Sequence, residues 1–184
     1  MDADTAHARS EPGGPRLPGR GDADGAVTAL FREHHLELVR LALLMTGDLA
    51  TAEDVVQDAF EHLHRHWRRL REPGSGLAYA RTSVVNGCRM AHRRRAVARR
   101  YAPRLAGSAA AGPDATAAMA DESEMVAALG VLPRRQREIL VLRFYADLAP
   151  AEVAATLRIS ESTVRSATSR GLAGLARVLE RGQS

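Results

Sequence analysis

The residues best suited to chemistry lie near the C-terminus, on one face of an expected helix. Residues 150–157 predict a short helix, and a second helix is expected from Glu161 after a tight turn. Ser160 suits the N-cap of the second helix because its hydroxyl can accept a hydrogen bond from a free backbone N–H. The outward face carries six polar residues able to enter a major groove of DNA: Ser162, Thr163, Arg165, Ser166, Ser169 and Arg170. The alternative is an ordinary helical hairpin with a solvated surface.

Apolar side chains are expected to hold these two helices together across the turn. The residues expected to face one another are Val153, Ala154 and Leu157 on the first helix and Val164, Ala167, Leu172 and Leu175 on the second. Such a turn often demands a left-handed residue, a conformation that glycine adopts more cheaply than the arginine found at position 158.

A second basic cluster lies on a long helix expected from about Leu77. Asn86, Arg89 and Arg93 are spaced to share one face, and Arg94 with the arginines after it extends the positive charge. Phosphates are the natural partners of such a cluster, although a charge run is often only a solvated face. Asn86 stands among apolar neighbours, where its amide could read a base edge or satisfy the backbone.

An acidic strip lies on the helix that precedes this one. Thr51, with Asp54 three residues later, resembles a capping box, and an apolar stripe at helical spacing then runs from Ala52 to Trp67. The opposite face carries the acidic strip, which consists of Glu53, Asp54, Gln57, Asp58 and Glu61. The strip suits a basic protein partner, or it simply keeps an exposed helix soluble.

The sequence gives little support to metal binding or catalysis. His62 and His66 are one turn apart, with His64 nearby, but no further ligand has suitable spacing. No glycine-rich phosphate loop, nucleophile elbow or acid–base pair is evident, so we expect no enzyme, no catalytic residue and no cofactor.

Composition narrows the class of protein further. The 184 residues carry a formal net charge of +4, and the lone cysteine, Cys88, excludes an intramolecular disulfide. This composition fits a reducing, cytoplasmic setting. The N-terminus has no apolar core of the kind a signal peptide requires, and the longest apolar stretch, Leu41 to Met45, is too short to cross a bilayer. Stable membrane insertion is therefore not expected.

Helical periodicity without strand-like alternation predicts an all-α fold with two small helical domains. Residues 1–25 are expected to form a disordered tail, 26–100 the first domain, 101–122 a flexible linker and 123–180 the second domain. The first helix should start near Val27 and end at Gly47, and the segment from Arg71 to Gly76 should be a loop. In the second domain, Met125 is expected in the core with Val126, Leu129 and Leu132.

Both domains, in this order, resemble the sigma-70 family, specifically the extracytoplasmic-function (ECF, group IV) sigma factors of the actinobacterial sigma-E-like type. The resemblance covers about residues 27–100 and 123–180. The first block holds LFREHHLELVRLALLMTGDLATAEDVVQDAF and LAYARTSVVNGCRMAHRRR, and the second holds LPRRQREILVLRFYADL and AEVAATLRISESTVRSATSRGLAGL. The blocks correspond to sigma regions 2 and 4.

The resemblance implies a transcription initiation factor that binds core RNA polymerase and promoter DNA. It implies that Asp54, Gln57, Asp58 and Glu61 bind a coiled coil of the largest polymerase subunit. The 71–76 loop and Asn86 would capture a flipped base of the minus-ten element. The residues implied to serve that element are Trp67, Asn86, Arg89, Arg93 and Arg94. The helix from Glu161 would read the minus-thirty-five element, and a separate anti-sigma factor would regulate the protein.

Two other functions remain open on sequence grounds. One is a helix-turn-helix regulator that acts without polymerase and uses its first domain for dimerisation or sensing. The other is an interaction protein without promoter-specific DNA contacts. The acidic strip discriminates between the first alternative and a sigma factor, because a plain regulator has no need of it for polymerase binding.

Overall fold

The computed structural model of the chain describes residues 23–70, 75–101 and 117–182, and these residues form helices joined by short connections. The described residues contain no strand, which confirms the all-α prediction. Residues 1–22 of the predicted N-terminal tail lie outside the described residues. Residues 23–25, also predicted to belong to the tail, are helical, so the first helix begins four residues before the predicted start at Val27. No helix in the described ranges is long and apolar enough to span a lipid bilayer.

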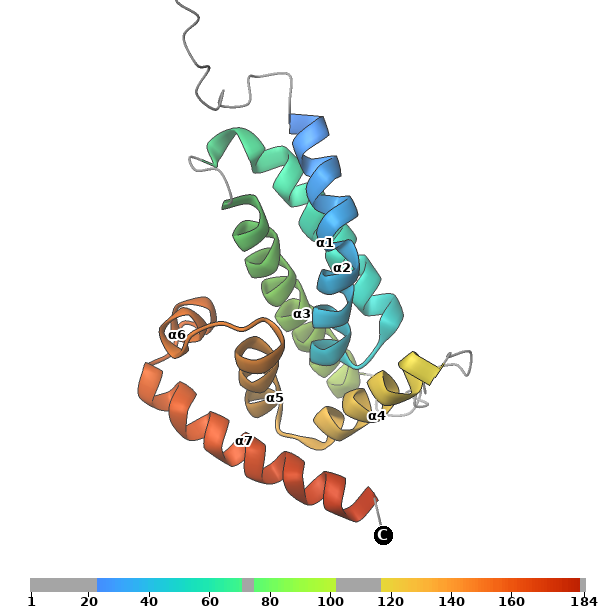
Figure 1. Cartoon of the computed structure of the whole chain (residues 1–184), viewed down its shortest axis with the longest axis vertical. Helices are drawn as coiled ribbons and strands as arrows, with labels where there is room; N and C mark the ends of the chain where they lie inside the picture. Colours follow the sequence, from blue (N-terminus) through green and yellow to red (C-terminus); the bar gives the residue numbers. More distant parts are fainter. Residues whose placement is uncertain (1–22, 71–74, 102–116, 183–184) are drawn as a thin grey trace, which may run out of the picture.

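The long helices of the first unit lie side by side in a bundle (Figure 1). It consists of α1 (Ala23–Thr46), α2 (Leu49–His66), the short 3-10 helix η1 (Trp67–Arg69) and α3 (Ser75–Tyr101). Its core includes Leu38, Met45, Val56, Leu63 and Val84, all fully buried. The predicted loop is shorter than expected, because Ser75 and Gly76 already belong to α3; residues 71–74 lie outside the described ranges.

The connection between α1 and α2 shows how the local sequence sets a helix boundary. Gly47 adopts a left-handed φ of 74°, which ends α1 as predicted. The cap of α2 is Asp48, whose carboxylate accepts a hydrogen bond from the backbone N–H of Thr51 at 3.0 Å. The prediction that Thr51 starts this helix was wrong, because Asp48 is better placed to satisfy the free N–H groups.

The second unit gathers at one end of the bundle (Figure 1). It comprises α4 (Ala117–Val131), α5 (Arg134–Leu140), the π-helical segment η2 (Val141–Tyr145), α6 (Pro150–Leu157) and α7 (Glu161–Gly182). Helix α4 starts at Ala117, inside the segment predicted to be a linker. The last six residues of that predicted linker, 117–122, are therefore helical. Residues 102–116 lie outside the described ranges. Alanines dominate the start of α4 and favour helix even without large apolar side chains.

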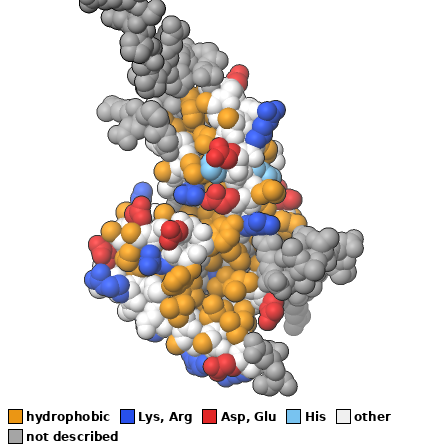
Figure 2. All heavy atoms as spheres, viewed as in Figure 1, with side chains coloured by type: hydrophobic (Ala, Val, Ile, Leu, Met, Phe, Trp, Pro, Cys, Tyr) orange, Lys and Arg blue, Asp and Glu red, His pale blue; other side chains and the backbone are white. Residues whose placement is uncertain are grey.

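Two apolar residues of the second unit were assigned wrongly to its core. The side chain of Met125 is 39% exposed and that of Leu172 is 44% exposed. Helix α7 instead uses Gly171, where an added Cβ would lie 3.0 Å from Cδ1 of Leu140, to approach α5 closely. The apolar spacing correctly predicted a helix here. The buried face of α7, however, contains Gly171, and not the neighbouring Leu172 as predicted. Figure 2 shows that hydrophobic side chains remain at the surface over this part of the molecule.

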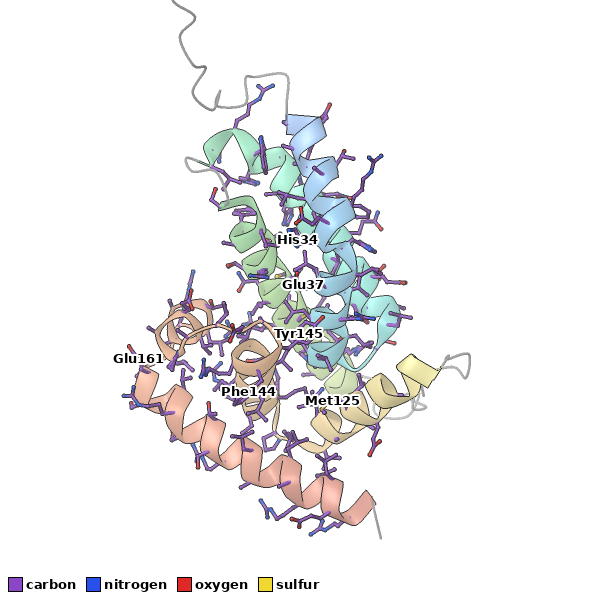
Figure 3. The ribbon with its side chains drawn as sticks, in the orientation of Figure 1. His34, Glu37, Met125, Phe144, Tyr145 and Glu161 are labelled. Carbon is purple, nitrogen blue, oxygen red and sulfur yellow. The ribbon has the colours of Figure 1, made fainter. Side chains whose placement is uncertain are left out.

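The two units contact one another through α1. The hydroxyl of Tyr145 donates a hydrogen bond to the carbonyl oxygen of Glu37 at 3.2 Å, and the guanidinium of Arg137 donates to that of Met45 at 3.4 Å. Figure 3 shows Tyr145 reaching toward the stretch of α1 that carries Glu37. The buried apolar residues of both units form one cluster. No pattern in the sequence predicts this contact.

Candidate nucleic-acid and protein interfaces

The acidic strip lies on the exposed face of α2. Ala52, Val55, Val56, Ala59 and Leu63 are buried on the inner face, as the periodicity predicts. The five members of the acidic strip are all exposed. None of the four acidic members is held in an ion pair with the rest of the bundle by any contact within the described residues, so these carboxylates are available to a partner.

A groove of about 820 Å³ between α2 and α3 joins two sets of residues that the sequence analysis treated separately. Asp54, Gln57 and Asp58 line its α2 side, and Asn86 and Arg94 line its α3 side. The surface expected to meet a protein and part of the surface expected to meet DNA are therefore continuous.

Gly87 sets the width of this groove. A Cβ added at Gly87 would lie only 2.7 Å from Cγ1 of Val55, so either the Val55 side chain or the helix backbone would have to shift. Because α2 and α3 touch here through a glycine, Asn86 next to it is presented at the surface close to α2. The amide of Asn86 is exposed, so it is free to meet a partner rather than being occupied in the core.

The remaining residues predicted to serve the minus-ten element are spread around this groove. Arg93 and Arg94 are exposed and Arg89 is half-buried, but only Arg94 lines the groove. Trp67 is partly buried and packs against the core. A Cβ added at Gly76 would lie 2.8 Å from the Trp67 ring, so the ring packs directly against the first turn of α3.

Two ion pairs that the sequence analysis missed position α3. The guanidinium of Arg81 donates to Glu37 on α1 at 2.6 Å, and that of Arg95 donates to Asp48 at 2.6 Å. Burial alone would raise the pKa of Glu37, but Arg81 and His34 together lower it. The hydrogen bonds from Thr51 lower the pKa of Asp48, against a smaller effect of burial, and Arg95 adds to the lowering. The sequence contains these opposite charges, but nothing in it indicates that residues so far apart form ion pairs.

The C-terminal helices form the predicted helix-turn-helix. Helix α6 spans Pro150–Leu157 and α7 begins at Glu161, as expected. Arg158 has a φ of 54°, so the left-handed turn is made by an arginine. The hydroxyl of Ser160 accepts a hydrogen bond from the N–H of Thr163 at 3.2 Å, which confirms its role as the N-cap.

The predicted reading face of α7 is exposed throughout. All six of the polar residues expected to meet DNA, Ser162, Thr163, Arg165, Ser166, Ser169 and Arg170, are exposed, while Val164 and Ala167 on the opposite side are buried. Arg165 pairs with Glu161 at 3.1 Å along the same helix. An exposed pair of this kind contributes little stability, so Arg165 can exchange it for a base edge or phosphate. Figure 3 labels Glu161 at the start of α7.

The side chains of two of the three histidines of α2, His64 and His66, have other partners. His66 contacts the carbonyl oxygen of His62 at 2.9 Å and stacks on Tyr79, while His64 contacts Asp24 at 2.6 Å. Within the described ranges, no group of three or more histidine, cysteine, aspartate or glutamate side chains is arranged to hold a metal ion.

The comparisons with known proteins match both units in order. The family model described as sigma-70 region 2 matches residues 30–99, and the model described as sigma-70, region 4 matches residues 128–177. The chain is 34% identical over 154 residues to the ECF RNA polymerase sigma factor SigM of Mycobacterium tuberculosis, covering 84% of this chain and 77% of that protein. It is 30% identical over 138 residues to the RNA polymerase sigma-E factor of Streptomyces coelicolor, covering 75% of this chain and 77% of that one.

Two solved structures share the fold at 22% identity. One is the sigma factor RpoE in complex with the anti-sigma factor NepR from Bartonella quintana, with a TM-score of 0.69 over 83% of this chain and 98% of that chain. The other is CnrH in complex with the cytosolic domain of CnrY, with a TM-score of 0.63 over 88% of this chain and 94% of that chain. The chain belongs to the sigma-70 family of RNA polymerase sigma factors, in the extracytoplasmic-function subfamily.

Proposed function

We propose that this protein binds core RNA polymerase, directs it to a particular set of promoters and helps to melt them. The observation that carries the proposal is the pairing of two matched units: a region 2 bundle with an exposed acidic strip beside Asn86, and a region 4 helix-turn-helix with an exposed polar face. The alternative of a regulator that acts without polymerase is not favoured, because it leaves the match to region 2 without a role.

Four members of the acidic strip, all but Glu53, form the proposed polymerase-binding surface. Asp54, Gln57, Asp58 and Glu61 lie on consecutive turns of α2 and are exposed, so a basic helical surface can approach them without unfolding the bundle. Charge complementarity of this kind guides association and fixes the register of the two partners.

The α3 side of the groove is the proposed site for the minus-ten element. Flipping a base out of the duplex costs a few kcal/mol of unstacking, which contacts to the flipped base must offset. Asn86 offers an amide able to donate and accept hydrogen bonds at a base edge, while Arg89, Arg93 and Arg94 supply charge for phosphates. Trp67 closes the end of the bundle where α3 begins. The 71–74 part of the predicted loop lies outside the described residues.

The exposed face of α7 is the proposed reader of the minus-thirty-five element. Its short side chains at Ser162, Thr163, Ser166 and Ser169 let the helix lie deep in the major groove. Arg165 is proposed to contact a base and Arg170 a phosphate. The isolated second unit should bind DNA weakly and with a steep salt dependence, because few phosphates are neutralised in the absence of polymerase.

An anti-sigma factor is the proposed regulator. The two solved structures compared above are described as complexes, RpoE with the anti-sigma factor NepR and CnrH with the cytosolic domain of CnrY. We further propose that the protein acts in the cytoplasm, where the chromosome lies, and performs no catalysis of its own.

Transcription with purified core polymerase tests the proposed function. Fragmented genomic DNA from the source organism would be transcribed with and without the protein, and the RNA 5′ ends sequenced. New start sites that share two spaced upstream motifs are the expected result. A folded protein with active core polymerase that yields no new starts would contradict the proposal and favour the independent regulator.

A further inference from the structure

The end of α1 and the C-terminal half of α3 approach α5 at the contact between the two units (Figure 1). A basic pocket lies at this contact. Its volume is about 330 Å³. The lining residues are Thr46, His92, Arg95, Ala96, Arg134 and Arg137. Three of these six carry a guanidinium and none carries a carboxylate, which distinguishes this pocket from the mixed-charge groove between α2 and α3.

Positive charge exceeds negative charge around the pocket. Two carboxylates lie close by: Asp48 binds Arg95 at 2.6 Å, and the buried Glu138 binds Arg134 at 2.6 Å. Glu138 also faces Arg135 at 3.6 Å, so it is shared between two guanidiniums. Around the pocket there are thus two carboxylates for four guanidinium groups, those of Arg95, Arg134, Arg135 and Arg137.

Arg137 is held in place by hydrogen bonds to backbone carbonyl oxygens, and within the described ranges its guanidinium forms no ion pair of its own. Its terminal nitrogens donate to the carbonyl oxygens of Gly130 at 2.9 Å and Met45 at 3.4 Å. Its Nε is buried without a hydrogen-bond partner. A buried donor without a partner costs free energy. Nε2 of His92 is directed to the same carbonyl oxygen of Met45, at 2.9 Å, so two pocket residues share this acceptor.

We propose that this pocket binds a small polyphosphate anion, either free pyrophosphate or the polyphosphate of a nucleotide. Guanidinium groups bind phosphate oxygens through paired, charge-assisted hydrogen bonds, and three of them converge here. At about 30 Å³ for each water, the volume holds roughly eleven water molecules, enough space for two linked phosphoryl groups with some of their hydration. A duplex is too wide to enter a pocket of this size.

Binding would strengthen the contact between the two units. The ligand would touch Arg95 and Ala96 of the first unit together with Arg134 and Arg137 of the second. A ligand that binds only when the units are in contact stabilises that arrangement in proportion to its concentration and affinity. The inference goes beyond the proposed function and does not depend on it.

The sharpest variant adds charge without removing any contact. Ala96 is exposed at the pocket, so Ala96→Glu should repel a polyphosphate while leaving the helix intact, because glutamate is a good helix former. Ala98→Glu is the matched control: it makes the same change on the same exposed helix, at a residue outside the pocket lining. Arg134→Gln is a second test, which removes one guanidinium from a partly exposed position.

Isothermal titration calorimetry of the full chain with pyrophosphate, at constant ionic strength, tests the proposal. We expect saturable binding of one pyrophosphate per chain, weakened about tenfold or more by Ala96→Glu and by Arg134→Gln but less than about twofold by Ala98→Glu. Circular dichroism would establish that each variant is folded. Absence of saturable binding, or equal affinities for the wild type and for both folded pocket variants, would overturn the proposal.

Parallel titrations distinguish the source of the polyphosphate. Tighter binding of a nucleoside triphosphate than of pyrophosphate would support a nucleotide ligand, and equal binding would support recognition of the polyphosphate alone. Binding of the nucleotide without any binding of pyrophosphate would overturn the proposal, as would displacement of pyrophosphate by short duplex DNA.

Discussion

The two units build their candidate surfaces in different ways. The surface of the second unit is one face of a single helix, α7, whose exposed polar residues follow one another at helical spacing. The surface of the first unit is a groove between α2 and α3, and its two sides come from residues about 30 positions apart in the sequence. The α7 surface therefore needs only that α7 forms and packs on its neighbours, whereas the groove exists only if α2 and α3 approach closely. Substitutions should affect the two surfaces differently.

The largest effect is expected from neutralising the α2 side of the groove. The combined substitution Asp54→Ala, Gln57→Ala and Asp58→Ala should weaken core polymerase binding by about 2 kcal/mol or more, roughly thirtyfold, because it removes two charges and an amide from one contact surface. Fluorescence anisotropy with labelled protein and core polymerase measures the loss. Glu53→Gln is the control, since Glu53 is exposed on the same helix but does not line the groove. Unchanged affinity in the triple variant would refute the assignment of the acidic strip.

A somewhat smaller effect is expected where α2 meets α3. Gly87→Ala should reduce the free energy of unfolding by about 1–3 kcal/mol, because its Cβ would lie 2.7 Å from Val55 and overpack the contact. Chemical denaturation measures the change. Gly130→Ala is the control, because nothing lies within 4 Å of its added Cβ. That helical substitution should leave stability unchanged or raise it. Equal effects of the two substitutions would show that close approach at Gly87 does not define the groove.

A change on α7 should alter DNA recognition without altering stability. Arg165→Ala should cost about 1–3 kcal/mol of discrimination between the preferred minus-thirty-five sequence and other sequences, with little change in nonspecific affinity. Competition assays with holoenzyme and promoter variants measure the discrimination. Arg177→Ala serves as the control because Arg177 is exposed on α7 but lies far from its first turns. If both variants lost affinity equally for every sequence, Arg165 would be a phosphate contact and not a base contact.

The smallest effect concerns the contact between the units. Burial lowers the pKa of His92, and the charges of Arg134 and Arg137 lower it further, against the hydrogen bond to Met45. The unfolded chain then binds a proton at a higher pH than the folded chain does. Stability from this group should therefore fall as the pH drops below about 6.5, the ordinary histidine pKa, and level off once the folded-state pKa is passed.

Thermal unfolding between pH 7.5 and 5.5 measures this dependence. The variant His92→Gln should show a shallower loss of stability over the same range, because it removes the titrating group. Identical pH profiles for the wild type and His92→Gln would show that His92 does not titrate differently in the folded and unfolded states. Cys88 cannot account for a change in this range, because burial raises the pKa of its thiol to about 12.

Local features of the fold were predictable from the sequence. The features that depend on interactions within a few residues are the boundaries of α6, the start of α7, the N-cap at Ser160, the left-handed residue at Arg158 and the glycine that ends α1. Apolar periodicity likewise predicted the buried face of α2, because a helix that packs on one side must repeat its apolar residues every three to four positions. The acidic strip and the polar face of α7 followed directly from those helices.

Tertiary structure decided which faces meet and how closely. The glycines at 87 and 171 allow close packing against Val55 and Leu140, which no apolar pattern signals because glycine has no side chain to count. Met125 and Leu172 are apolar yet exposed, since the packing of α4 and α7 turns them outward. The pairing of Arg81 with Glu37 and the basic pocket between the units join residues more than 40 positions apart. The sequence alone determined the helices and the residue types on their surfaces, but only packing between helices determined which of those residues share a site.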